Sequence, residues 1–290
     1  RPASAGTELD IEASVPLLID AILAADPNKR HVDLVVATEP APEADINILS
    51  AAIGARLADF AGIAGIFAKD LTRGQELCIN CDVAFTGTSA LRIGIAAEVY
   101  RNHDIALPSE TASLMRDMLA ETDNAAADQL LASVSATGPY SGAQQVTELL
   151  SSLGLESSFM VAPLGDRGEL APPNIVTPAN ARTDLTTQPD PYVQTTALEA
   201  GLLLENIQQC SNGGGSLRAL YPQTLTPAEC EEILGWMAQN ETRTPLGERM
   251  PPDTRIVHEH AWGGNAHADI SLVYGSQSNF ILVVFLYQPE

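Results

Sequence analysis

The chain has 290 residues, enough for one large globular domain with a small appendage, and 45% of them are apolar. Its formal net charge of −22, from 37 acidic and 15 basic residues, repels duplex nucleic acid and anionic bilayers, which excludes both as partners. No apolar run approaches the length of a membrane span.

Residues 1–45 are predicted to form an N-terminal appendage and linker. Residues 9–25 carry apolar side chains at helical spacing, and residues 31–37 are typical of a strand. A proline-rich acidic linker follows at 38–45. The piece is too short to fold as a domain, and it resembles the tail of an upstream domain of the peptidoglycan-binding type.

Residues 46–290 are predicted to form the main domain, beginning with an amphipathic helix and a β-hairpin. The helices expected after the hairpin cover 89–101, about 109–134, 141–153, 194–210 and 226–240, and a proline-rich loop covers 161–192. Three strand-like runs, at 254–262, 267–275 and 279–288, end the chain. Strands at both ends with helices between them predict an α+β fold, in which an antiparallel sheet built from both termini packs against an all-helical insertion.

The four cysteines predict disulfides and an extracytoplasmic location, secreted or at the cell surface. Cys210 and Cys230 are placed to tie one helix end to the next helix, and Cys78 and Cys81 are near enough for a local bridge. An even cysteine count in an acidic, lysine-poor chain favours an oxidising compartment. A four-cysteine zinc site would need a second Cys-x-x-Cys pair, which the sequence lacks.

Two motifs give the main domain a family resemblance. The segment 85–93, FTGTSALRI, comes after the hairpin and opens a helix, and the segment 121–131, ETDNAAADQLL, follows it. They resemble the Ser-x-x-Lys and Ser-Asp-Asn motifs of the penicillin-recognising serine hydrolases, most of all the class A β-lactamases. The resemblance makes Ser89 the nucleophile and places Arg92 where the family has its basic lysine. Thr122 and Asn124 then occupy the proton-relay and substrate-binding positions.

The third motif of that family, Lys-Thr-Gly on a strand beside the nucleophile, matches only by position. The register of residues 257–262, VHEHAW, places Glu259 at the lysine, His260 at the threonine and Ala261 at the glycine, so Glu259 and Ala261 become the substrate-binding positions. Glu259 would repel an anionic substrate. The family's deacylating glutamate has no recognisable counterpart among the loop carboxylates, which are Asp166, Glu169, Asp184 and Asp190.

These departures leave two functional hypotheses. Arginine stays protonated at any workable pH, so Arg92 cannot act as a general base, and no lysine occurs after Lys69. The first hypothesis is therefore a catalytically degenerate domain with a binding or structural role at the cell surface, on peptidoglycan or in a surface protein assembly. The alternative is a serine hydrolase in which His260 activates Ser89 and Asp269 orients the imidazole. Glu259 cannot orient it without a bulge, because neighbours on a strand point to opposite faces.

Metal and cofactor sites are not expected. His258, His260 and His267 could meet across two adjacent strands. The sequence indicates no further residues that would complete a metal site, so we interpret the histidines as strand residues packing on Trp262. The glycine run at 213–215 is not followed by Lys-Ser or Lys-Thr, which excludes a phosphate-binding loop.

Overall fold

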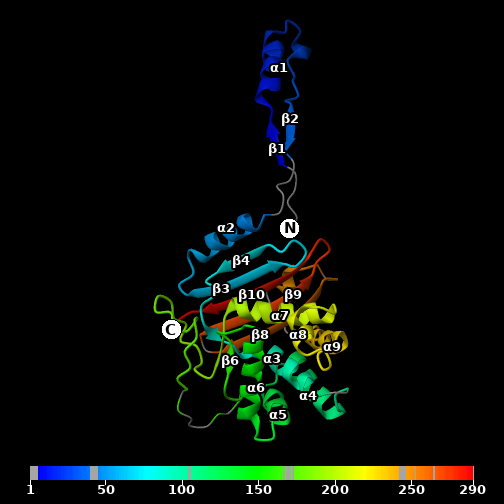
Figure 1. Cartoon of the computed structure of the whole chain (residues 1–290). Coiled ribbons are helices and arrows are strands. Elements are labelled where there is room, and N and C mark those ends of the chain that lie inside the picture. Colours follow the sequence, from blue (N-terminus) through cyan, green and yellow to red (C-terminus); the bar gives the residue numbers. More distant parts are fainter. Residues whose placement is uncertain are drawn as a thin grey trace. The chain divides into compact units, whose positions relative to one another are not determined.

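The computed structural model of the chain describes residues 6–39, 45–103, 106–165, 167, 171, 173–241, 246–251, 253–263 and 265–289 (Figure 1). The chain divides into two compact units, Arg1–Ala52 and Ile53–Glu290. This boundary falls inside helix α2 (Ile46–Leu57). The division at residues 45 and 46 inferred from the sequence stays a prediction.

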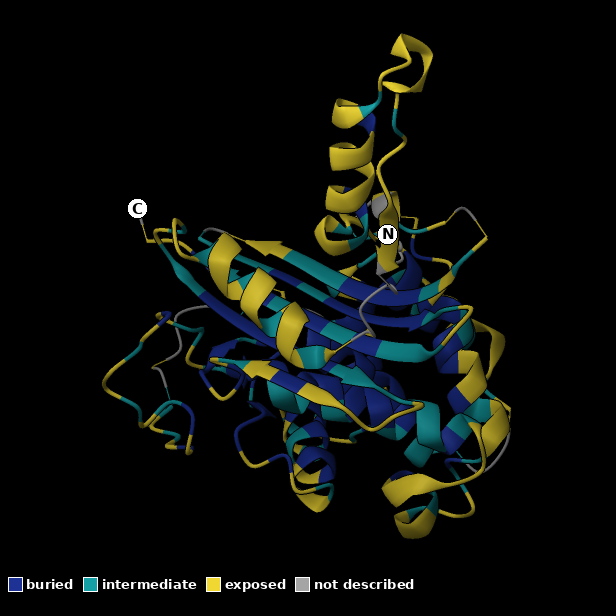
Figure 2. Cartoon of the chain, turned by 90° about the horizontal axis from the view of Figure 1, so that it is seen from above, coloured by how far each residue is buried: buried dark blue, intermediate teal, exposed yellow. Residues whose placement is uncertain are grey.

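The first unit is a helix with a two-stranded antiparallel sheet. Strand β1 (Gly6–Leu9) pairs with β2 (Val36–Glu39), and α1 (Ile11–Leu23) and the short 3₁₀ helix η1 (Pro27–Lys29) lie between them in the chain. The Asp10 carboxylate accepts from the amide of Ala13 and caps α1. The helix agrees with the sequence pattern, whereas the second strand begins later than predicted and β1 was not predicted. Most residues of α1 are exposed (Figure 2).

The second unit is organised around a five-stranded antiparallel sheet of order β4-β3-β10-β9-β8. Its strands are β3 (Ile63–Asp70), β4 (Glu76–Ile79), β8 (Arg255–Gly263), β9 (Ala266–Tyr274) and β10 (Asn279–Tyr287). Strands from the start of the unit therefore pair with strands from its end (Figure 1). The predicted α+β fold, the hairpin and the three final strands are confirmed.

Helices fill the chain between β4 and β8 and pack against one face of this sheet (Figure 1). They are α3 (Thr88–Arg101), α4 (Ser109–Ala120), α5 (Asn124–Ser133), α6 (Pro139–Ser152), α7 (Ala197–Ser211), α8 (Gly215–Leu220) and α9 (Pro227–Met237), with the 3₁₀ helix η2 (Gly247–Arg249) before β8. Leu91 and Ile93, on opposite sides of α3, are both completely buried, which makes α3 the central helix of the core. No helix within the described ranges is long and apolar enough to cross a bilayer.

Glycine brings α7 close to the sheet. A Cβ on Gly201 would lie 2.4 Å from a ring carbon of Phe67 on β3, so a larger residue would push the helix away. Three short strands, β5 (Phe85–Thr86), β6 (Phe159–Met160) and β7 (Val193–Thr195), form a second small sheet of order β5-β7-β6. These strands and α8 were not predicted.

Two details of the sequence interpretation can be compared directly with the structure. The disulfides Cys78–Cys81 and Cys210–Cys230 are both present, as predicted. The single helix expected over residues 109–134 is wrong, because the backbone breaks at 121–123 between α4 and α5. Thr122 has φ of +59° there, a left-handed conformation that is unfavourable for a β-branched residue and that no helix can contain.

Candidate functional site

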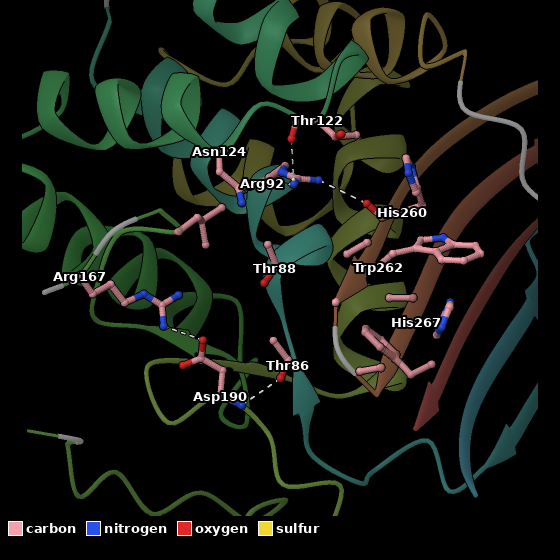
Figure 3. A pocket seen from close by; sticks show the side chains of 16 residues that line it. Thr86, Thr88, Arg92, Thr122, Asn124, Arg167, Asp190, His260, Trp262 and His267 are labelled. Atoms are coloured by element: carbon pink, nitrogen blue, oxygen red, sulfur yellow. Dashed lines mark hydrogen bonds and ion pairs between the residues drawn. The ribbon is translucent and has the colours of Figure 1, made fainter. Parts of the chain in front are cut away.

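A cavity of about 500 Å³ lies where the start of α3, the turn before α5, part of the 161–192 loop and the β8–β9 hairpin meet (Figure 3). Its walls are formed by Thr86, Thr88, Arg92, Thr122, Asn124, Leu164, Arg167, Asp190, His260, Ala261, Trp262, Gly263, Ala266, His267, Ala268 and Phe285. Five of the seven site residues predicted from the sequence line it: Arg92, Thr122, Asn124, His260 and Ala261.

The start of α3 is held close to the small sheet. Thr86 on β5 pairs with Gln194 on β7, and a Cβ on Gly87 would lie 3.0 Å from the Gln194 carbonyl carbon, so glycine permits this approach. Ser89 lies in the first turn of α3, but its side chain lies outside what the structure describes. Its role as nucleophile stays a prediction.

Arg92 lies one turn after Ser89, is 4% exposed and connects the three motifs. Its Nη1 donates to Glu259 Oε2 at 3.2 Å and to the His260 carbonyl oxygen at 3.3 Å. Its Nη2 donates to the Thr122 carbonyl oxygen at 3.1 Å and to Asn124 Oδ1 at 2.8 Å. The guanidinium therefore holds α3, the turn before α5 and strand β8 together (Figure 3).

Glu259 is completely buried and does not line the cavity. Its Oε2 accepts from Arg92, whereas its buried Oε1 has no hydrogen-bond partner among the described residues. Burial raises the pKa of Glu259 to about 8, against the opposing effect of the Arg92 charge and hydrogen bond. The two positions at which the resemblance implies lysines thus hold a buried cation–carboxyl pair. The substrate-binding role of Glu259 stays a prediction, and its side chain lies behind the wall of the cavity.

His260 leaves β8 on the face opposite to Glu259. The pairing of β8 with β9 is regular from Arg255 to Gly263 and places His260 across from Asp269, so the side chains alternate without a bulge. Burial lowers the pKa of His260, with His258 and Arg92 adding to the effect and Asp269 opposing it. Asp269 is in place as a cross-strand neighbour. His260 lines the same cavity as Arg92, which lies one turn after Ser89, and its role as a base stays a prediction.

The other two histidines have neighbours of their own. A ring nitrogen of His258, Nε2, lies 3.1 Å from the Asn240 carbonyl oxygen. The His267 ring meets Trp262 edge-on, with centroids 4.2 Å apart. No group of three or more potential metal ligands gathers anywhere in the described ranges.

The sequence interpretation missed a second ion pair in the cavity wall. Arg167 Nη1 lies 2.5 Å from Asp190 Oδ2, and Arg167 Nε donates to the Pro163 carbonyl oxygen at 2.6 Å. Asp128 on α5 accepts from the amides of Leu164 and Gly165 and fixes the start of the same loop. The loop is long and proline-rich, and no periodic pattern indicates which of its charges meet.

Of the four loop carboxylates, the structure describes Asp184 and Asp190, and Asp184 does not line the cavity. Asp184 forms a surface pair with Arg182, and Asp166 and Glu169 lie outside the described residues. Asp190 does line the cavity, where it is bound to Arg167 and accepts from the amide of Tyr192 through Oδ1. Asp190 is thus engaged on both oxygens.

Comparisons with known proteins agree on the fold and the family. An ancestral class A β-lactamase is 20% identical and covers 83% of this chain and 92% of its own, with a TM-score of 0.60. A β-lactamase from Desulfarculus baarsii is 15% identical and covers 86% of this chain and 91% of its own, with a TM-score of 0.62. A point mutant of PBP-A in its acyl-enzyme complex with penicillin G is 16% identical and covers 86% of this chain and 90% of its own, with a TM-score of 0.64. No curated protein sequence matches. The model of the β-lactamase enzyme family matches residues 109–290, more than half of the chain, and the protein therefore belongs to the β-lactamase enzyme family.

Proposed function

We propose that this protein is a catalytically inactive member of its family that binds a ligand in the cleft without forming a covalent bond to it. The buried pair of Arg92 and Glu259 is the observation that carries this proposal. Both residues stand where the family resemblance implies lysines, and they contact each other instead of presenting a free amine and a free cation to the cavity.

The missing base is the first supporting argument. Serine needs an adjacent proton acceptor to become a nucleophile, and a guanidinium with four hydrogen bonds cannot accept a proton. Lys69 is no substitute, because it lies on β3 with its amine bound to Glu76 and Glu205. Loss of a positioned base typically lowers the rate by about 10²–10⁴.

The missing anion anchor is the second argument. A substrate carboxylate needs a cation that is free to donate to it, and both described arginines in the cavity wall, Arg92 and Arg167, already contact a carboxyl group. The carboxylate of a β-lactam or of a peptide C-terminus would therefore lose its hydration without gaining a cation as a partner. The acidic balance of the whole chain acts in the same direction.

The binding role is placed outside the cytoplasm, secreted or at the cell surface. The disulfides Cys78–Cys81 and Cys210–Cys230 support an oxidising compartment. Peptidoglycan and a surface protein assembly are the partners that fit this location, and the net charge of −22 disfavours nucleic acid.

One observation favours the alternative of a serine hydrolase. Thr122 and Asn124 line the cavity near the start of α3, where the resemblance places a proton relay and a substrate-binding amide. An activated Ser89 would then need His260 as its base, and this residue lines the same cavity.

Intact-mass analysis after incubation with a fluorophosphonate and, separately, with benzylpenicillin decides between the two. The control is Ser89→Ala, and the pH is varied from about 6 to 9 to cover histidine titration. We expect no adduct on the folded protein at any pH. An adduct that is absent in Ser89→Ala would overturn the proposal and establish an enzyme.

A further inference from the structure

Resting on the proposed function, we propose that the cleft binds an uncharged saccharide, with Trp262 as the surface on which a sugar ring stacks. The observations behind this proposal are the engaged arginines of the cavity wall, its hydroxyl and amide lining, and an exposed indole at its edge.

The charged side chains of the cavity wall are bound to other groups of the protein. Arg92 is bound to Glu259, and Arg167 is bound to Asp190 at 2.5 Å. The depressed pKa of His260 keeps its imidazole uncharged near neutral pH. Each arginine of the described wall contacts a carboxyl group, and the one lining carboxylate is engaged by Arg167. A neutral ligand loses least on entering such a site.

The polar groups that remain suit a ligand rich in hydroxyl groups. Thr86, Thr88 and Thr122 line the cavity, and a hydroxyl both donates and accepts hydrogen bonds, as sugar hydroxyls do. Asn124 Oδ1 accepts from Arg92 at 2.8 Å, which leaves its Nδ2 as a donor in the wall (Figure 3). A sugar hydroxyl or an acetamido carbonyl oxygen can accept from that amide.

Trp262 supplies the apolar contact. It is 73% exposed. Burying a large aromatic side chain stabilises a protein by about 2–3 kcal/mol, and this stabilisation is available to a ligand that covers the indole. The ring is steadied by the edge-on contact with His267 and lies across the cavity from Thr88 (Figure 3). The C–H face of a pyranose ring is an apolar surface of matching size, and its rim of hydroxyl groups would face the threonines.

Other stacking ligands fit less well. A nucleobase could stack on Trp262, but its phosphates would be repelled by a chain of charge −22. A β-lactam carries a carboxylate for which the wall holds no free cation among the described residues. A neutral saccharide can both stack on the indole and form hydrogen bonds with the hydroxyl groups.

Isothermal calorimetry on the full chain tests the proposal. The probes are tri-N-acetylchitotriose and cellotriose, both neutral, and acetyl-D-Ala-D-Ala as a carboxylate of similar size. We expect saturable binding of at least one saccharide with a Kd of about 1 mM or tighter, and none of the dipeptide. Trp262→Ala and Thr88→Val should each weaken binding about tenfold or more. Leu220→Ala, which truncates an exposed apolar residue outside the cavity, should bind as the wild type does.

The outcomes separate this inference from the function on which it rests. Absence of saccharide binding, or Trp262→Ala binding as tightly as the wild type, overturns the saccharide inference. Binding of the dipeptide in preference to both sugars, without a covalent adduct, overturns it too, while an inactive binding domain still stands. A serine-dependent adduct in the mass experiment overturns the proposed function itself.

Discussion

Replacing Arg92 by methionine removes the cation of the buried pair and should destabilise the protein by an amount that grows with pH. At about pH 6 Glu259 holds a proton, because its pKa is raised to about 8. The cost there comes from the acceptors that Arg92 leaves behind, which include the Thr122 carbonyl oxygen and Asn124 Oδ1. Unsatisfied buried acceptors cost about 1–3 kcal/mol each, and partial relaxation brings the expected total to about 3 kcal/mol.

The pH dependence follows from the proton on Glu259. Between 4.5, the ordinary pKa of the group, and about 8 the folded protein binds one proton more than the unfolded chain, so stability falls as the pH rises through this window. In the wild type the fall ends near pH 8, where Glu259 ionises beside Arg92. Without Arg92 the pKa of Glu259 rises further, so the stability of the variant continues to fall above pH 8. One pH unit above 8 therefore adds about 1.4 kcal/mol to the cost of the substitution.

Urea unfolding between about pH 6 and 9.5 measures this cost, with the buried Trp236 as the fluorescent reporter. Arg92→Met combined with Glu259→Gln should lose the additional pH dependence, since nothing titrates at the pair. Arg116→Met, which changes an exposed arginine on α4, should follow the wild type at every pH. A cost of Arg92→Met that stays constant from pH 6 to 9.5 would refute the claim that Glu259 titrates against Arg92.

The other predictions concern stability and the loop. Thr122→Asn should raise the unfolding free energy by about 1 kcal/mol, because asparagine tolerates the left-handed conformation better than threonine, and an unchanged urea midpoint would argue against strain there. Replacing both Cys210 and Cys230 by serine should lower it by about 3 kcal/mol, as expected for a bridge with a sequence separation of 20; a variant whose urea midpoint equals that of the wild type in non-reducing buffer would contradict this. Asp128→Asn weakens the acceptor of two loop amides and should speed proteolytic cleavage within residues 161–192, whereas cleavage at the wild-type rate would show that the loop is fixed by other contacts.

Much of the fold could be predicted because the patterns involved are local. The three strand-like runs at the end of the chain predicted the final strands, and helical spacing with proline boundaries predicted most helices of the second unit. The break at Thr122 could not be predicted, since threonine gives no signal for a left-handed backbone. Strands β5, β6 and β7 have two or three residues each, too few for a periodic pattern.

The sequence motifs indicated which residues belong to the candidate site, but they did not indicate which of these residues contact one another. Arg92, Thr122, Asn124, His260 and Ala261 all line the cavity, and their catalytic and binding roles stay predictions. That Glu259 would meet Arg92 was not visible, because the partners are 167 residues apart and charge alone does not indicate pairing. The face of His260 depends on strand register, which a sequence fixes only to within one residue.

The interlocked pair of Arg92 and Glu259 also separates this cleft from an active one by more than a single substitution. Glu259→Lys alone would place two cations about 3 Å apart in a dry interior. Arg92→Lys alone would keep the charge but give up the forked reach to the Thr122 carbonyl oxygen and Asn124 Oδ1. Either intermediate would be less stable than its neighbours on the mutational path. A return to two lysines would therefore have to pass through a less stable protein, which disfavours that change.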